Sequence, residues 1–324
     1  MSKPGIGSGR RALKRHINGM LLLDKPTGIS SNGALQRARY MLEARKGGHT
    51  GNLDPIATGL LPLCFGETTR ISGFFLDADK RYWTRIKLGE ATNTQDREGE
   101  VIFSSDKTVS AEALLKEIDR FRGQFEQTPP MFSAIKKNGQ PLYKLARKGI
   151  EVEREARPVN VYNLEVKDFD GQFVEVEIAC SRGFYVRSLA NDLGEALGVG
   201  GHVVELRRLG VGELDVADAV TLEEFDALGD PSARAATLLG SDSGLGHLPK
   251  VDLSVDATFY IVRGQSVSAS NLPDSGWVRL YSSHTGFLGL GEITDDGQVA
   301  PKRLFTKTRS VSPRSDDLRT NHRI

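Results

Sequence analysis

Cysteine is scarce in this chain, long apolar runs are absent, and neither sign of charge dominates. The 324 residues include only two cysteines, Cys64 and Cys180. They cannot form a disulfide framework and lack the spacing of a metal knuckle, which favours a reducing compartment. No apolar run approaches the roughly 20 residues that cross a bilayer, and Met20–Leu23 is too short for a signal-peptide core. We therefore expect a soluble protein of the cytoplasm that contacts no membrane and holds no metal.

The charges nearly cancel, with 43 Lys and Arg against 42 Asp and Glu, so net charge alone predicts no nucleic-acid partner. Their distribution is uneven, because residues 1–16 carry five basic side chains and no acid. From Lys302 to the end, basic residues exceed acids by seven to two, whereas eight acids oppose only Arg234 between Leu209 and Pro249. A neutral total can contain a basic stripe that fits a nucleic acid, although most charge runs are solvated faces.

Hydrophobic periodicity predicts an α+β fold, and the length predicts about two domains. Three segments alternate apolar and polar residues as half-buried strands do: 82–88, 159–166 and 173–180. Three others place apolar residues at helical spacing: 31–42, 110–121 and 186–197. Because the two kinds of segment do not alternate as strict β-α-β units, we expect an antiparallel or mixed sheet with one covered face.

One carboxylate, Asp54, stands between a glycine-rich turn and an apolar run. The stretch from Gly48 to Leu61 reads Gly-His-Thr-Gly-Asn-Leu-Asp-Pro-Ile-Ala-Thr-Gly-Leu-Leu. On residue type alone, an Asp before a Pro is most often a turn or helix-cap residue. Its interpretation changes when four further blocks are read with it: Asn18–Ser31, Lys80–Tyr82, Cys180–Arg187 and His202–Leu209.

Together the five blocks resemble the pseudouridine synthases, and most closely the bacterial tRNA pseudouridine-55 synthase family. They stand in the family's order at family-like spacing over about residues 17–215, which is more specific than any single motif. Two positions depart from the family pattern: Asn52 stands where a small residue is usual, and Phe184 where Thr is common. Neither carries the chemistry, so we expect local repacking and no loss of function.

The resemblance implies a large central mixed sheet with an RNA cleft across it, and isomerisation of uridine 55 in the T loop of tRNA. Asp54 is then the nucleophile, and Arg187 pairs with its carboxylate and keeps it ionised. Tyr82 stacks on the uracil, and either Tyr82 or Tyr185 moves a proton when the ring rejoins the sugar. The reaction needs neither a metal nor an organic cofactor. Whether Asp54 attacks the sugar or the uracil ring stays open at this point.

The target uridine must be flipped out of its loop, at a cost of a few kcal/mol. The resemblance implies that His49, five residues before Asp54, fills the gap beside the extruded base. The alternative is a histidine that only caps the glycine-rich turn. Leu206 is expected to form the apolar floor beneath the base, and Lys25 and Tyr185 complete the expected substrate-binding set.

Residues 127–157 form an insertion unlike its surroundings. It opens with turn formers, and Leu142–Ile150 reads as a basic amphipathic helix. The segment resembles the thumb that closes over the T arm of tRNA in this family, although a plain surface loop is the alternative. Five basic residues are the resulting candidates for contacts with the RNA backbone: Lys136, Lys137, Lys144, Arg147 and Lys148.

Beyond about residue 250 the pattern changes to short alternating runs broken by Gly and Asp-Gly turns: 257–262, 277–281 and 286–293. These runs predict a small β-barrel, and the position resembles that of a PUA-type RNA-binding domain. We therefore divide the chain into four parts: a basic N-terminal tail (1–16), a catalytic domain with the thumb (17–249), the PUA-type domain (250–309) and a disordered tail (310–324).

Other functions fit parts of the chain. A glycoside hydrolase needs two carboxylates, and only Asp54 has motif support. A non-catalytic RNA-binding or tRNA-folding protein would keep the thumb and barrel, but has no need of Asp54, Tyr82 and Arg187 together. A guide-RNA-dependent pseudouridine synthase is closer, yet the thumb-like insertion favours direct recognition of tRNA. We therefore predict a monomeric tRNA pseudouridine synthase, and leave open whether it also assists tRNA folding.

Overall fold

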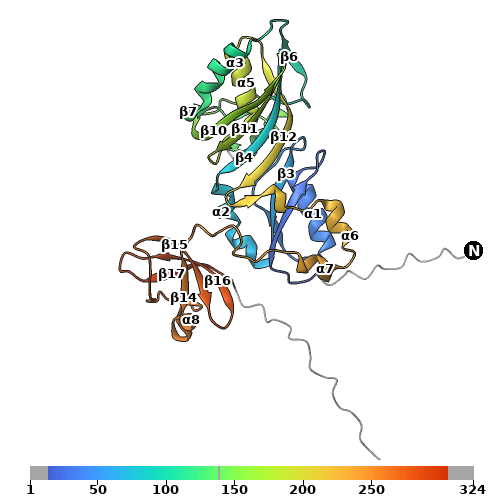
Figure 1. The fold of residues 1–324 in the computed structure, drawn as a ribbon. Helices are drawn as coiled ribbons and strands as arrows, with labels where there is room; N and C mark the ends of the chain where they lie inside the picture. Colours follow the sequence, from blue (N-terminus) through green and yellow to red (C-terminus); the bar gives the residue numbers. More distant parts are fainter. Residues whose placement is uncertain (1–13, 138, 306–324) are drawn as a thin grey trace, which may run out of the picture.

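A nine-stranded mixed sheet forms the centre of the molecule (Figure 1). The computed structural model describes residues 14–137 and 139–305. The main strand order is β1-β3-β12-β4-β11-β10-β7, with β2 paired to β3 and β13 to β12. Among the described strands of this sheet, only β12 and β3 pair in parallel. The strands are β1 (Gly19–Lys25), β2 (Gly47–His49), β3 (Thr58–Phe65), β4 (Lys80–Leu88), β7 (Gly123–Gln127), β10 (Arg157–Phe169), β11 (Phe173–Cys180), β12 (Gly201–Val211) and β13 (Leu214–Asp215).

Helices on one face of this sheet share a single apolar core with it. They are α1 (Ser31–Met41), α3 (Ala111–Ile118), α5 (Val186–Ala196) and α6 (Leu222–Ala227), each of which contributes buried residues to the core. The α+β class and the three expected strands are confirmed. The three expected helices are also confirmed, although the one expected over 110–121 ends as a short 3₁₀ turn, η2 (Asp119–Phe121).

Strand β1 is buried on both faces, which explains its unbroken apolar run. Leu21 and Leu23 lie in the core shared with the helices. Met20 and Leu22, which point to the opposite face, lie in a second apolar cluster with Phe75 and Leu290. That cluster is completed by η1 (Gly66–Ile71), α2 (Ser72–Asp77), η3 (Val216–Asp218) and the segment that holds Leu245 and Leu248. Helix α7 (Pro231–Ala236) packs Ala235 against the first core instead.

The C-terminal part is a small β domain with one helix. Its sheet has the order β14-β15-β16-β17, formed by β14 (Lys250–Leu253), β15 (Gly276–Ser282), β16 (Gly286–Ile293) and β17 (Val299–Leu304). A bridge between Val267 and Val299 extends it. The small β domain is therefore present as expected, and within residues 250–305 its strands pair as an open four-stranded sheet.

One expected strand of this domain is wrong. Residues 257–261 lie in helix α8 (Val255–Ile261), and Val262 is its C-cap residue. The Ser254 hydroxyl accepts a hydrogen bond from the Ala257 N–H and caps the helix. Ala257 and Ile261, four residues apart, are both buried, which is helical spacing within a sequence that otherwise looks strand-like.

The C-terminal domain packs on η1 and α2, the short elements that cover the second face of the large sheet. Leu290 joins Phe75 in the shared cluster, and the ring of Trp277 meets that of Phe74 edge to face with 4.9 Å between centroids. Arg70 adds a hydrogen bond from Nη1 to the carbonyl of Leu304, at 3.0 Å. The division of the chain near residue 249 stays a prediction, and the two parts share apolar surface across it.

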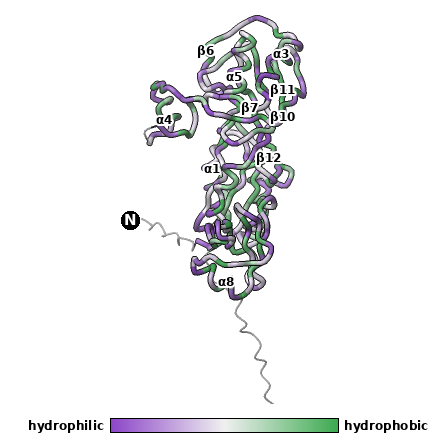
Figure 2. The backbone as a smooth tube through the Cα atoms, turned by 90° about the vertical axis from the view of Figure 1, so that its left-hand side faces the viewer, coloured by the Kyte–Doolittle hydropathy of each residue, from purple (hydrophilic) through white to green (hydrophobic). Residues whose placement is uncertain are grey.

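The expected thumb projects from the body as a separate hairpin and helix (Figure 2). It contains β8 (Lys136–Lys137), β9 (Gln140–Pro141) and α4 (Leu142–Ala146). The helix is shorter than the expected 142–150 because Gly149 adopts a left-handed φ of 71° and the Ile150 N–H turns back to the Leu145 carbonyl. A second hairpin, β5 (Glu90–Thr92) and β6 (Val101–Ser104), follows β4.

The two expected tails lie almost wholly beyond the part of the chain that the structure describes. Most of the expected N-terminal tail (1–16) and all of the expected C-terminal tail (310–324) lie outside the described residues. Within the described part, no helix is both long and apolar enough to span a membrane.

Candidate active site

Asp54 lies in a tightly held loop between β2 and β3. The loop is fixed by Ser31, whose hydroxyl accepts a hydrogen bond from the Leu53 N–H at 2.7 Å and donates one to the Leu53 carbonyl at 3.1 Å. On the other side, the Gly28 N–H donates to the Pro55 carbonyl at 2.8 Å. The Asp54 side chain is 29% exposed. The carboxylate is thus rigidly presented at a surface that a substrate can reach.

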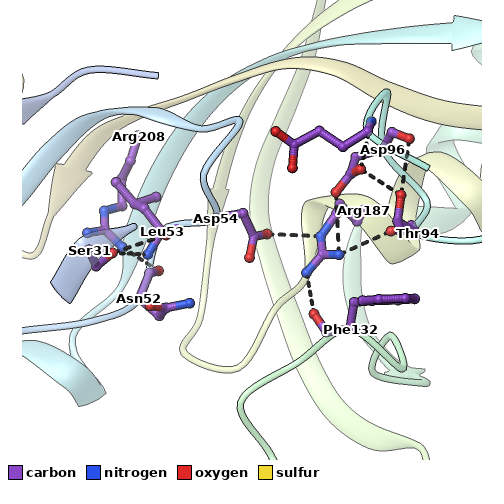
Figure 3. A network of polar contacts seen from close by, with 10 residues as sticks. Ser31, Asn52, Leu53, Asp54, Thr94, Asp96, Phe132, Arg187 and Arg208 are labelled. Carbon is purple, nitrogen blue, oxygen red and sulfur yellow. Dashed lines mark hydrogen bonds and ion pairs between the residues drawn. The ribbon is translucent and has the colours of Figure 1, made fainter. Parts of the chain in front are cut away.

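Arg187 grips this carboxylate from the first turn of α5 (Figure 3). Its Nε lies 2.9 Å from Asp54 Oδ2, so the expected ion pair is confirmed. The Arg187 side chain is only 5% exposed. Its Nη1 donates to the Thr94 carbonyl at 3.1 Å and its Nη2 to the Phe132 carbonyl at 2.7 Å. The planar fork is therefore fixed on several sides, which a point charge could not achieve.

Asp96 is a site residue that the sequence reasoning missed. Its Oδ2 lies 3.5 Å from Arg187 Nη1, and its side chain is 6% exposed. Its Oδ1 accepts hydrogen bonds from the Thr94 hydroxyl at 2.6 Å and from the Glu98 N–H at 3.1 Å. Two carboxylates thus share one guanidinium. The sequence signal is only a Thr-x-Asp spacing typical of turns, which does not reveal the distant arginine.

The protonation of Asp54 is set by opposing effects. Burial raises its pKa, and the charge of Asp96 adds to the rise. The Arg187 and Lys25 charges and the hydrogen bond from Arg187 lower it. Desolvation is the largest of these effects, and the ion pair with Arg187 opposes it by favouring the carboxylate form.

Tyr82 lies beside a buried arginine that also holds the nucleophile loop. On the sheet, Tyr82 of β4 pairs with Arg208 of β12. The Arg208 side chain donates from Nε to the Leu60 carbonyl at 2.7 Å and from Nη1 to the Asn52 carbonyl at 3.4 Å. Burial raises the pKa of Tyr82 to about 12, with Arg208 opposing the rise, so the phenol is neutral near pH 7.

Arg208 is a second residue that the sequence reasoning did not single out. It is 1% exposed and stands opposite Gly59 in the parallel register of β12 and β3. Gly59 has φ of 97°, and a Cβ there would lie 2.3 Å from the Arg208 carbonyl oxygen, so only glycine fits. Gly59 thus lets the start of β3, which follows the Asp54 loop, pack closely against β12.

Tyr185 and Leu206 reach the same region from α5 and β12. Tyr185 immediately precedes α5, two residues before Arg187, and burial raises the pKa of its phenol. Leu206, 7% exposed, pairs with Thr84 on β4 and joins the main apolar core. The structure thus places a mostly buried apolar side chain on β12 and two neutral phenols on β4 and at the start of α5. Their individual roles stay predictions.

Lys25 is completely buried, and its ammonium is directed at the main chain. Its Nζ donates to the carbonyls of Pro26 at 2.9 Å, Ile29 at 2.8 Å and Pro55 at 3.5 Å. Burial lowers its pKa to about 8. With three carbonyls for three N–H groups, Lys25 ties the turn after β1 to the residue that follows Asp54. Direct contact between Lys25 and the substrate stays a prediction.

His49 is the last residue of β2 and pairs with Leu63. Its ring is half-buried, burial lowers its pKa, and among the described residues its Nδ1 has no hydrogen-bond partner. The departures from the family pattern are accommodated: Asn52 is exposed, and Phe184, 8% exposed, packs in the main core. The insertion of His49 into RNA stays a prediction.

The five basic candidates of the thumb are all exposed. Lys136 and Lys137 form β8, and the other three line a hollow of about 470 Å³ together with Gln140 and Pro141. Within residues 14–137 and 139–305, no cluster of three or more His, Cys, Asp or Glu could hold a metal ion.

The solved structures most useful for comparison share this fold. The chain superposes on the structure titled "Crystal Structure of a Cbf5-Nop10-Gar1 Complex" with a TM-score of 0.69 and 25% identity, covering 89% of this chain and 85% of that one. The archaeal box H/ACA sRNP Nop10-Cbf5 complex gives a TM-score of 0.67 at 23% identity, covering 92% and 89%. These two likenesses place the chain in one class of fold, here with an ion-paired carboxylate at the centre of the site.

Sequence comparison narrows the class to one family. Residues 39–186 match "TruB family pseudouridylate synthase (N terminal domain)", residues 187–243 match "tRNA pseudouridylate synthase B C-terminal domain", and residues 249–305 match "Pseudouridine synthase II TruB, C-terminal". "tRNA pseudouridine synthase B" of Pseudomonas aeruginosa (strain UCBPP-PA14) is 49% identical over 298 residues, which are 91% of this chain and 98% of that protein. The protein of the same name from Nitrosococcus oceani is 48% identical over 299 residues. The chain belongs to the TruB family of pseudouridylate synthases.

Proposed function

We propose that this protein isomerises uridine 55 in the T loop of tRNA to pseudouridine. The relatives named tRNA pseudouridine synthase B are matched over nearly their whole length, which supports tRNA as the substrate. The observation that carries the chemistry is the 2.9 Å ion pair between Arg187 and the partly exposed Asp54. A passive RNA-binding module has no use for a buried arginine that keeps one accessible carboxylate charged.

The reaction rearranges bonds without oxidation or reduction. Asp54 attacks as a carboxylate, the N-glycosidic bond breaks, the uracil turns, and a bond forms between the sugar and a ring carbon. The ring carbon loses a proton and the released nitrogen gains one. Attack at the sugar and attack at the uracil ring both fit a carboxylate presented in this way.

The surroundings of Asp54 provide what a detached uracil needs. Leu206 supplies apolar contact, and Tyr82 supplies an aromatic face. Burial raises the pKa of both Tyr82 and Tyr185, so each phenol carries its proton at neutral pH. One of them gives its proton to the released ring nitrogen and, as the resulting phenolate, takes up the proton that the ring carbon loses on rejoining.

RNA recognition is assigned to the thumb and to the residues around the flipped base. The basic side chains of residues 136–148 contact the T-arm phosphates, and His49 occupies the position vacated by the base. The C-terminal domain provides a further RNA contact. The protein works as a monomer in the cytoplasm, without metal or cofactor.

The direct test is to map pseudouridine by mass spectrometry in a T-arm minihelix incubated with the purified protein. A matched minihelix with cytidine at position 55 is the control. Modification only at position 55 supports the proposal, and modification elsewhere or none overturns it.

The same assay separates this proposal from a guide-RNA-dependent enzyme. The pure chain, with no added RNA or protein partner, is expected to modify the minihelix. The support is the thumb hairpin and the high coverage of relatives named as tRNA enzymes. Activity that requires an added guide RNA would favour the rival function.

A further inference from the structure

Gln127 is a buried side chain that grips the residue before α5. It ends strand β7, pairs with Arg157 at the base of the thumb, and is 2% exposed. Its Oε1 accepts a hydrogen bond from the Tyr185 N–H at 2.8 Å, and its Nε2 donates one to the Tyr185 carbonyl at 3.0 Å. One amide therefore satisfies both main-chain groups of a single residue.

Two more hydrogen bonds connect the same helix to the start of the thumb. The Ser188 hydroxyl donates to the Thr128 carbonyl at 2.9 Å. Arg187 Nη2 donates to the Phe132 carbonyl at 2.7 Å, while Nε of the same guanidinium holds Asp54. The thumb and the beginning of α5 thus form one connected unit, and the arginine that holds the nucleophile is part of it.

We propose that Gln127 is a positioning residue that fixes Tyr185 and Arg187 relative to Asp54 and couples the position of the thumb to that of the Arg187 guanidinium. The inference rests on the proposed function, because it concerns the rate of that reaction. Tyr185 is two residues from Arg187, so a shift of its backbone moves the start of the helix that carries the guanidinium. RNA that moves the thumb also moves the Phe132 carbonyl, to which Arg187 is bonded.

Because of this geometry, we expect loss of the Gln127 hydrogen bonds to lower the rate of the chemical step and not the affinity for RNA. Gln127 is buried and lies outside the exposed basic surface of the thumb, so it makes no contact with phosphates. A displacement of about 1 Å in a catalytic group can reduce a rate by roughly 100-fold. A purely structural role would instead lower the stability of the whole domain and leave the rate of the folded protein unchanged.

Two variants of Gln127 test the inference. Gln127→Glu keeps the acceptor for the Tyr185 N–H but places a carboxylate oxygen against the Tyr185 carbonyl. Gln127→Met keeps the length and removes both hydrogen bonds. The matched control is Thr68→Val, which removes a fully buried hydroxyl that accepts from the Gly19 N–H at 3.0 Å on the opposite side of the domain.

The measurements are the single-turnover rate at saturating T-arm minihelix, the Kd for the same RNA, and the thermal unfolding midpoint. We expect both Gln127 variants to lose about 10- to 100-fold in rate with Kd within about threefold of the wild type. Thr68→Val should keep the wild-type rate even if its midpoint falls as far as theirs. Gln127 variants with wild-type rates, or with rates reduced only as much as the control, would overturn the inference while leaving the proposed function intact. An inactive wild-type protein would overturn the proposed function and this inference with it.

Discussion

Asp54 is the residue on which the proposed chemistry depends most directly. Asp54→Asn keeps the shape of the side chain but removes the negative charge and the nucleophilic oxygen. We expect pseudouridine formation to fall by at least about 10⁴-fold, as removal of a nucleophile does in other enzymes. RNA binding should stay within a few-fold, because Asp54 contributes little surface. Substantial turnover by a sequence-verified variant that has not reverted to Asp would remove Asp54 from the mechanism.

Arg187 is expected to be nearly as sensitive, even to a conservative change. A lysine cannot reach Asp54, the Thr94 carbonyl and the Phe132 carbonyl at once, as the guanidinium does. Arg187→Lys should therefore lower the single-turnover rate by about 100-fold or more at saturating RNA. Near-normal kinetics would show that the arginine serves only the fold.

The pH dependence follows from the environment of Asp54. Burial raises its pKa above the ordinary value of 3.8, so the carboxylate takes up a proton at higher pH than an exposed aspartate does. Since only the ionised form attacks, the rate should rise with pH through this pKa and then level off. Single-turnover rates at saturating RNA from about pH 4 to about pH 8 test the sign. A rate that rises as pH falls would contradict the assignment of Asp54 as an ionised nucleophile.

At the scale of elements, we expect the thumb to contribute to RNA binding and not to the chemical step. Lys144, Arg147 and Lys148 surround one hollow next to α4 and are exposed. If two of them bind phosphates, replacing both with Gln should flatten the salt dependence of tRNA binding by about 0.7 to 0.9 log unit for each phosphate that is no longer neutralised. The single-turnover rate at saturating RNA should change much less. An unchanged salt slope would identify these residues as a solvated face.

Elements also show where sequence patterns mislead. Helical periodicity predicts that the thumb helix runs to Ile150. The helix ends earlier because Gly149 adopts a left-handed φ that stops it. Residues 257–262 contain β-branched and aromatic residues but lie in α8 and its C-cap, since burial of Ala257 and Ile261 against the C-terminal sheet outweighs the local preference for strand. The first case was decided by local backbone conformation and the second by tertiary burial, neither of which composition shows.

At the scale of the whole molecule, the contact between the two domains sets the cost of truncation. A protein ending at Pro249 keeps Asp54, Arg187 and both tyrosines, but uncovers Phe74 and Phe75, on which Trp277 and Leu290 pack. We expect it to fold with a lower unfolding midpoint, because exposing large apolar side chains costs about 1.5–3 kcal/mol each. It should still modify the minihelix, because the residues of the site are kept. The rate of modification should fall more for full-length tRNA than for the minihelix, because the C-terminal domain is proposed to contact RNA outside the T arm. Equal losses on both RNAs, or an insoluble product, would contradict the proposed domain boundary.

The sequence by itself determined the class of fold, the strands and helices around the site, and the pair of Asp54 and Arg187. The fold class, strands and helices are local in origin, because alternation and helical spacing report burial one residue at a time. The pair of Asp54 and Arg187 joins two distant motifs, and it was predicted only through the resemblance of the blocks to one family. Five blocks in a fixed order therefore sufficed for the family.

Only the tertiary structure decided how the polar side chains of the site are shared. Arg187 meets the Thr94 carbonyl across 93 positions of the chain, and Gln127 meets Tyr185 across 58. The partner of a buried polar group is chosen by the sheet order that brings distant segments together, because such a group must find its hydrogen bond wherever the fold places one. That is why Asp96, Gln127 and Arg208 became visible as parts of the site only once the chain was folded, and why Lys25 proved to bond the main chain.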